Sequence, residues 1–172
     1  MRTILIIAWL FLGLGAAIYH YGPGQKRVAM DGIESVLAEA RNNVSLKKYP
    51  QALEMFDKAM AELSVDNEGL AHRIQLEKAK AQMHAAQLPA ARASLQSMLA
   101  GLRSADSPDE ALIAETQQAL ANAQYYRTWL MRLEGQPEEA WKPEIEAARQ
   151  HFTQLNEKSL AAGDTEAAEK TA

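Results

Sequence analysis

The fold is decided by the stretch Tyr49-Pro50-Gln51-Ala52-Leu53-Glu54-Met55-Phe56-Asp57-Lys58-Ala59-Met60, which has the apolar pattern of a single helix. Proline is tolerated in the first turn of a helix but not in its interior, so Pro50 marks the start. Leu53, Phe56 and Met60 then recur at three- and four-residue steps, which places them on one face. The sequence therefore predicts an amphipathic helix that begins at Tyr49.

A second helix is predicted just before this one, from Asp31 to about Leu46. Its apolar residues recur three or four positions apart and form one stripe: Ile33, Val36, Leu37, Ala40 and Val44. The connection between the two helices is too short for anything but an antiparallel pair. Residues 31–63 are therefore expected to form a helical hairpin.

The same hairpin recurs thirty-nine residues later. At that shift Ala40 falls on Ala79, Ala52 on Ala91, and Phe56 on Leu95. A helix around 68–86 and another that opens at Pro89 follow from this register. The shared alanines indicate helix contacts, because a small side chain lets two helices approach closely while larger neighbours fill the space beside them.

A third hairpin is predicted after the loop 104–108. Ser107 is the expected N-cap, with Pro108 at the first helical position and Glu110 completing a capping box. The helix should run to about Glu134, and a last helix, in which Pro143 is either the start or a kink, should follow to Lys158. We expect an all-α domain of about three antiparallel hairpins over residues 31–158, with a flexible tail over 159–172.

The residues 49–60 quoted above resemble the second helix of a tetratricopeptide repeat. In that family a tyrosine, a small alanine, an aromatic residue and a second alanine recur at the spacing of Tyr49, Ala52, Phe56 and Ala59. The resemblance covers about one repeat well, and the thirty-nine-residue period exceeds the usual ~34. It implies degenerate repeats that bind protein partners, with the first helix of each pair lining a concave side.

An N-terminal membrane segment is predicted over residues 1–21. The run from Ile4 to Tyr21 contains no acid, Lys or Arg, and its length matches the about 20 residues that a spanning helix needs. The alternative is a cleaved signal peptide with a cleavage site near Gly15 to Ala17. We expect a single-pass anchor, a linker over 22–30, and the soluble part outside the cytoplasm, in the periplasm of a cell envelope with two membranes.

Composition argues against several function classes. The net charge of −4 is made of mixed signs without a basic stripe, so no nucleic-acid partner is expected. There is no cysteine, and the four histidines are far apart in sequence with no His-Glu-x-x-His pair. No nucleophile with a base and no phosphate-binding glycine loop is present. We therefore expect no enzyme activity, no cofactor, no metal and no small-molecule substrate.

The candidate partner-binding residues lie on the predicted first helices. Tyr125 and Trp129 share one helical face, which either packs inside the third hairpin or stays open to anchor a partner side chain. Beside them the register places Arg41, Arg73, Lys80 and Arg132. These cations are either simply solvated or form a basic groove that selects acidic segments or a free C-terminal carboxylate.

Two functions fit this sequence. One is a membrane-tethered adaptor or assembly factor that acts as a scaffold and holds a partner protein near the bilayer, as the tetratricopeptide resemblance implies. The other is a permanent structural subunit of a larger membrane complex, whose apolar faces stay covered.

Overall fold

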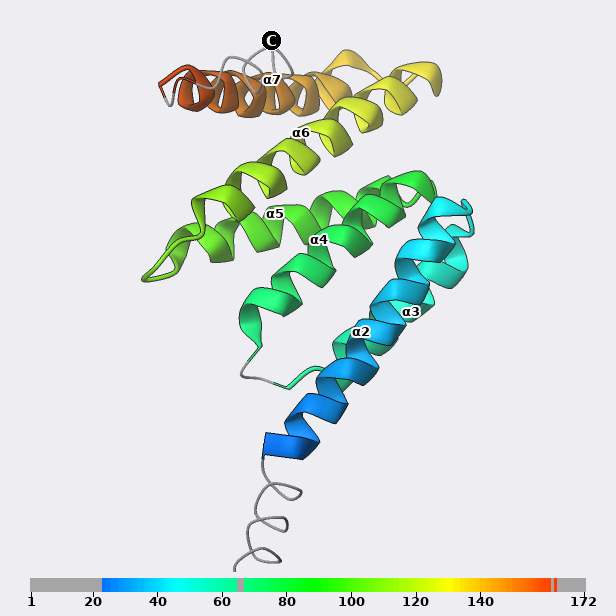
Figure 1. Ribbon diagram of the computed structural model, residues 1–172. Coiled ribbons are helices and arrows are strands. Elements are labelled where there is room, and N and C mark those ends of the chain that lie inside the picture. Colours follow the sequence, from blue (N-terminus) through cyan, green and yellow to red (C-terminus); the bar gives the residue numbers. More distant parts are fainter. Residues whose placement is uncertain (1–22, 65–66, 162, 164–172) are drawn as a thin grey trace, which may run out of the picture.

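The protein is all-α over the residues that its computed structural model describes, which are 23–64, 67–161 and 163 (Figure 1). This confirms the expected fold class at the level of secondary structure. The helices, labelled as in Figure 1, are α2 (Pro23–Ser45), α3 (Tyr49–Glu62), α4 (Glu68–His84), α5 (Leu88–Ser104), α6 (Glu110–Leu133) and α7 (Glu138–Ala161).

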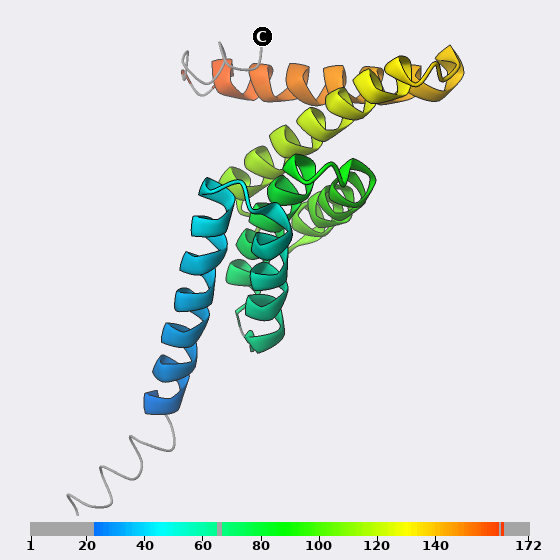
Figure 2. The same ribbon diagram turned by 90° about the vertical axis from the view of Figure 1, so that its right-hand side faces the viewer.

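Successive helices pair as three antiparallel hairpins that stack in chain order. Figure 1 shows the pair α2 and α3 at one end, α4 and α5 in the middle, and α6 and α7 at the other end, and Figure 2 shows the same order from the side. Each hairpin packs on the next through its second helix, α3 on α4 and α5 on α6, with a smaller contact between α4 and α6. The array is therefore held mainly by contacts between neighbours.

The turn inside each hairpin has the same backbone geometry. Lys47, Ala86 and Gly135 are left-handed, with φ of 58°, 59° and 72°. The N–H of each of these residues donates to the carbonyl of the residue three positions before it. The N–H of the following residue donates to the carbonyl five positions before that residue, as in a Schellman motif. These turns fix the register of the third hairpin, which repeats the second after forty-nine residues instead of thirty-nine.

The positions predicted to be close helix contacts are buried. Ala40, Ala52, Ala79 and Ala91 are at most 1% exposed, and Phe56 and Leu95 are fully covered. One apolar cluster joins α2, α3 and α4, and a second joins α4, α5 and α6. Each cluster therefore links one hairpin to the first helix of the next, which explains why the alanines recur in both.

Two helix starts differ from the sequence prediction. Helix α2 is described from Pro23, so residues 23–30, expected as a linker, are helical; the residues after Gly24 are compatible with a helix. Helix α6 begins after Asp109 and not after Ser107, because the Asp109 carboxylate accepts the N–H of Leu112 at 3.0 Å.

Helix α7 contains Pro143 in its interior and extends to Ala161, three residues beyond the predicted end of the domain. It therefore begins before Pro143, at Glu138. Its exposed side is almost entirely polar and charged, as is typical of the capping helix of a repeat array.

The predicted membrane anchor, residues 1–21, lies outside the described residues. Among the helices that the structure does describe, none is long and apolar enough to cross a bilayer.

Candidate partner-binding surface

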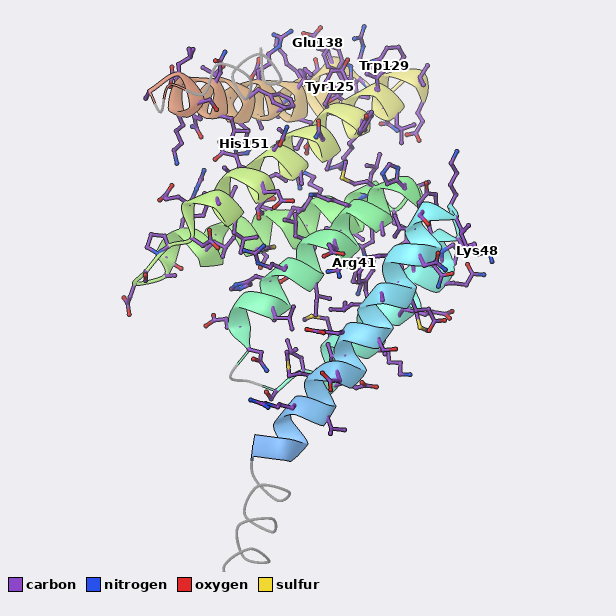
Figure 3. All side chains as sticks on the ribbon, in the orientation of Figure 1. Arg41, Lys48, Tyr125, Trp129, Glu138 and His151 are labelled. Carbon is purple, nitrogen blue, oxygen red and sulfur yellow. The ribbon has the colours of Figure 1, made fainter. Side chains whose placement is uncertain are left out.

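The C-terminal half of α6 carries a cluster of exposed large apolar side chains, which we call the α6 patch. Its members are between 43% and 71% exposed: Tyr125, Tyr126, Trp129, Leu130 and Leu133. They follow one another at steps of one, three and four residues and so cover one broad side of the helix. Figure 3 labels Tyr125 and Trp129 near the end of α6. An apolar cluster of this size on a monomer is typical of an interaction site.

The two aromatic residues predicted from the sequence both belong to this patch. Their exposure agrees with the open alternative and not with burial inside the third hairpin. Tyr126, Leu130 and Leu133 also belong to it, although the sequence analysis did not place them in the site. Their helical spacing was visible in the sequence, but only the packing shows that α7 covers the opposite side of α6.

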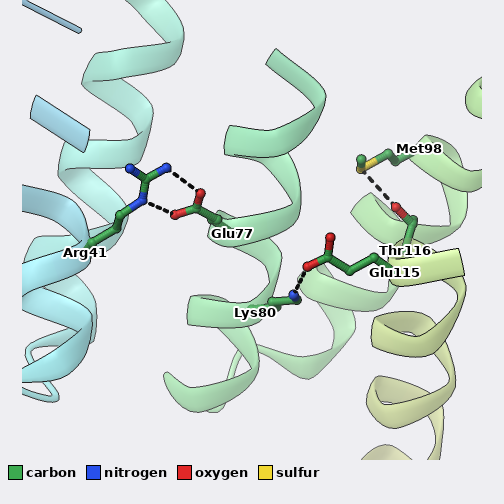
Figure 4. Close-up of polar contacts among 6 residues, drawn as sticks. All are labelled: Arg41, Glu77, Lys80, Met98, Glu115 and Thr116. Atoms are coloured by element: carbon green, nitrogen blue, oxygen red, sulfur yellow. Dashed lines mark hydrogen bonds and ion pairs between the residues drawn. The ribbon is translucent and has the colours of Figure 1, made fainter. Parts of the chain in front are cut away.

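Arg41, Arg73 and Lys80 lie on the first helices of the first two hairpins, and each is paired with a carboxylate on the next first helix or at its N-cap. Arg41 on α2 donates through Nε and a terminal nitrogen to the two oxygens of Glu77 on α4, at 2.8 and 2.7 Å (Figure 4). Lys80 on α4 donates to Glu115 on α6 at 2.6 Å, and Arg73 lies 3.8 Å from Asp109. The hydrogen bond that Arg41 donates to Glu77 raises the pKa of Arg41 above its usual value.

These pairs neutralise charge along the predicted basic groove. The three cations do lie along the first helices as expected, but the acids of the following helix balance their charge. The sequence did not indicate this pairing, because the partners are 35 or 36 residues apart and meet only when the hairpins stack. These exposed ion pairs link neighbouring hairpins, and each such pair contributes about 0.2–1 kcal/mol to the stability of the fold.

The fourth predicted cation, Arg132, lies beside the α6 patch. Its guanidinium carbon is 5.0 Å from the centre of the Trp141 ring on α7, within the range of a cation–π contact. Trp129, Arg132 and Leu133 line a hollow of about 250 Å³. The structure therefore brings Arg132 together with Trp129, while Arg41 and Arg73 lie on earlier hairpins.

A second hollow, of about 350 Å³, lies between α4 and α6. Its lining mixes apolar and polar groups: Lys80, Met83, His84, Glu115, Gln118, Ala119, Asn122 and Tyr126. Tyr126 joins this groove to the α6 patch, so the two surfaces are continuous.

The third hairpin is attached to the second by polar contacts that no local sequence pattern indicates. Glu144 on α7 accepts from Arg92 on α5 at 2.8 Å and from Arg127 on α6 at 2.9 Å. By the turn register Glu144 occupies the position of Phe56 and Leu95, so a carboxylate held by two guanidinium groups replaces an apolar core residue. This triad fixes α7 against both α5 and α6.

Two histidines, His84 and His151, pack against other parts of the fold. His84 stacks on Tyr49 with ring centres 5.3 Å apart. Burial, and then the charge of Arg103, lower the pKa of His151, whose Nδ1 is buried without a hydrogen-bond partner. Over residues 23–64, 67–161 and 163, no group of three or more His, Cys, Asp or Glu side chains has the geometry to hold a metal ion.

No protein-family model matches the sequence, and comparisons with curated proteins and with solved structures also found no match.

Proposed function

We propose that this protein is a helical-repeat adaptor or assembly factor, tethered to a membrane by its N-terminal segment, that holds a partner protein on the exposed side of α6. One observation carries the proposal: five large apolar side chains on one half of one helix are exposed together, whereas the other exposed large apolar residues of the described chain, Val28, Leu46 and Leu160, are isolated.

The chemistry of the patch supports binding to a protein. Tyrosine, tryptophan and leucine give a large apolar contact area, and tyrosine and tryptophan are enriched at the centres of protein interfaces. Both aromatic types also keep one polar group for a hydrogen bond at the rim. The balanced ion pairs on the other first helices favour an apolar anchor over selection by net charge.

The tetratricopeptide-like assignment is part of the proposal. Its support is the repeated turn at Lys47, Ala86 and Gly135 together with the buried alanines at matching positions. The membrane tether and a location outside the cytoplasm rest on the apolar run from Ile4 to Tyr21. This arrangement would hold the α6 patch near a bilayer.

The same patch also suits a permanent subunit of a membrane complex, because obligate interfaces are large and apolar. The two functions differ in whether the partner exchanges. If the partner dissociates on dilution and leaves a stable, monodisperse protein, the adaptor is favoured; if the protein aggregates once the partner is removed, the subunit is.

The test is co-purification of the full-length protein with its partners from detergent-solubilised membranes. We expect the double variant Trp129→Ala/Leu133→Ala to lose a partner protein that the wild type retains. Leu46→Ala is the matched control, because Leu46 is 54% exposed but lies at the end of α2, away from the α6 patch.

The variants should fold normally, since exposed side chains contribute little to stability. Equal urea midpoints for all three proteins would confirm that. If the double variant then retained every partner of the wild type, the patch would not be the binding surface.

A further inference from the structure

Two members of the α6 patch, Tyr125 and Trp129, occupy the side of α6 on which the next hairpin of the array would stack. The three left-handed turn residues align the hairpins position by position. In that alignment Leu37 of α2, Leu76 of α4 and Tyr125 of α6 are equivalent. Arg41, Lys80 and Trp129 are equivalent in the same way.

In the first two hairpins these positions join one hairpin to the next. Leu37 and Leu76 are buried in the clusters that extend to the following first helix. Arg41 and Lys80 are tied to acids of that following helix, Glu77 and Glu115 (Figure 4). At α6 the residue equivalent to buried Leu37 and Leu76 is Tyr125, which is 43% exposed, and the residue equivalent to the paired Arg41 and Lys80 is Trp129, which is 53% exposed.

The residue change at the open end fits an apolar neighbour. A cation that would need a carboxylate on the next helix is replaced by Trp129, which needs none. The hollow between Trp129, Arg132 and Leu133 offers space for a side chain of the incoming element. The surface therefore continues the stacking interface of the molecule itself.

Helices α4 and α6 each pack on a preceding hairpin, and their buried residues show which side chains such a contact uses. On α4 the buried residues include Ile74 and Ala81, and on α6 they include Ile113 and Leu120. Both sets are spaced by seven residues, which is two helical turns. An incoming helix would present apolar residues at the same spacing.

We infer that the Tyr125 and Trp129 side of the α6 patch receives an amphipathic α-helix of a partner protein, which lies beside α6 as α6 lies beside α4. This inference rests on the proposed function and names its mode: helix stacking at the end of the array, rather than an extended peptide in the groove between α4 and α6.

The experiment uses a benzophenone probe in the full-length protein within its native membranes. Tyr125→p-benzoylphenylalanine and Trp129→p-benzoylphenylalanine test the stacking side, Gln118→p-benzoylphenylalanine tests the groove, and Gln150→p-benzoylphenylalanine on the exposed side of α7 is the control. After irradiation, the attachment points are mapped by mass spectrometry.

The expected result is that positions 125 and 129 attach to one partner segment, at residues three, four or seven apart, while position 150 attaches to none. A synthetic peptide of that segment should gain helicity on binding, and Trp129→Ala should weaken it by about tenfold or more. Leu46→Ala should leave its affinity unchanged.

Three results would overturn the inference. Attachment to a second copy of this chain would make the patch a dimer contact. Attachment from position 118 alone, or to partner residues without helical spacing, would exclude stacking but leave the adaptor function intact. If no protein attached to position 118, 125 or 129, both the helix stacking and the adaptor function would be excluded.

Discussion

Lys47 and Ala86 hold the same left-handed backbone conformation at the turns of the first two hairpins, with φ of 58° and 59°. In the third hairpin the equivalent residue is Gly135, at 72°. A side chain in this conformation brings its Cβ close to the carbonyl oxygen, whereas glycine adopts it freely. The three hairpins therefore use the same turn, but only the third has the residue that favours its left-handed conformation, Gly135.

The turn device predicts opposite effects for two exchanges. Ala86→Gly should stabilise the protein by about 0.5–1 kcal/mol, and Gly135→Ala should destabilise it by about 1 kcal/mol. No atom would meet a Cβ at Gly135 within 4 Å, so the cost there is conformational and not a clash. Urea unfolding followed by circular dichroism measures both. Shifts of the same sign would mean that the turns are not equivalent.

Ala52 and Ala91 lie at equivalent positions of the second helices, and both are 0% exposed. Leucine at either position should destabilise the protein by roughly 1–3 kcal/mol, because the added atoms have no space between the paired helices. Exposed Ala61→Leu at the end of α3 is the control and should be nearly neutral. Unchanged unfolding midpoints for both buried variants would contradict the observed helix contacts.

The predictability of the fold depends on the range of the interactions. Ala52 and Ala91 were found from the sequence because apolar periodicity and a repeat are local patterns. The Asp109 cap was missed because Ser107 and Pro108 offered a competing local signal. Local patterns therefore predict element type better than element boundaries.

The candidate site was predicted only in part, for the same reason. Tyr125 and Trp129 were identified by residue type and spacing, but their exposure depends on which side of α6 the neighbouring helices cover. Likewise Glu77 and Glu115 neutralise cations far away in sequence, and no local pattern indicates that. The sequence therefore places the cations on the first helices but not the acids that balance their charge, and the preference of the groove for acidic segments stays a prediction.

The membrane tether gives a prediction for the full-length protein. It should sediment with membranes and resist extraction by high salt and alkaline carbonate, because the run from Ile4 to Tyr21 would hold it by apolar burial and not by charge. Detergent should release it. Recovery of a shortened chain that begins near Ile18 in the soluble fraction would instead indicate a cleaved signal peptide.

The triad of Arg92, Glu144 and Arg127 gives a prediction about the attachment of α7. The Glu144 side chain is only 11% exposed and partners both guanidinium groups. Glu144→Ala should therefore destabilise the protein by about 2–4 kcal/mol, because two partly buried cations lose their partner. The triple variant Arg92→Met/Glu144→Leu/Arg127→Met should recover most of that loss, since apolar residues of similar size can replace a buried ion triad. A triple variant as unstable as Glu144→Ala would show that the triad is needed for the packing geometry itself.

The surroundings of His151 predict a pH dependence that one substitution should remove. By the turn register His151 occupies the position of buried Leu102, and burial and then Arg103 lower its pKa in the folded protein. In the unfolded chain the histidine has an ordinary pKa of about 6.5, so the unfolded chain binds the proton more tightly than the folded protein. His151 therefore lowers the free energy of unfolding as the pH falls from about 6.5 toward its folded pKa, and it has no such effect above about pH 6.5.

His151→Leu should abolish this contribution, so the advantage of the variant over the wild type in unfolding free energy should grow as the pH falls from about 7 to about 5. It should also remove the buried Nδ1 that has no hydrogen-bond partner, which favours the variant at neutral pH. His72→Leu, at a half-buried histidine on α4, is the control for the other histidines of the chain. An advantage of His151→Leu that stayed constant with pH would mean that His151 takes up its proton equally well in the folded and unfolded protein.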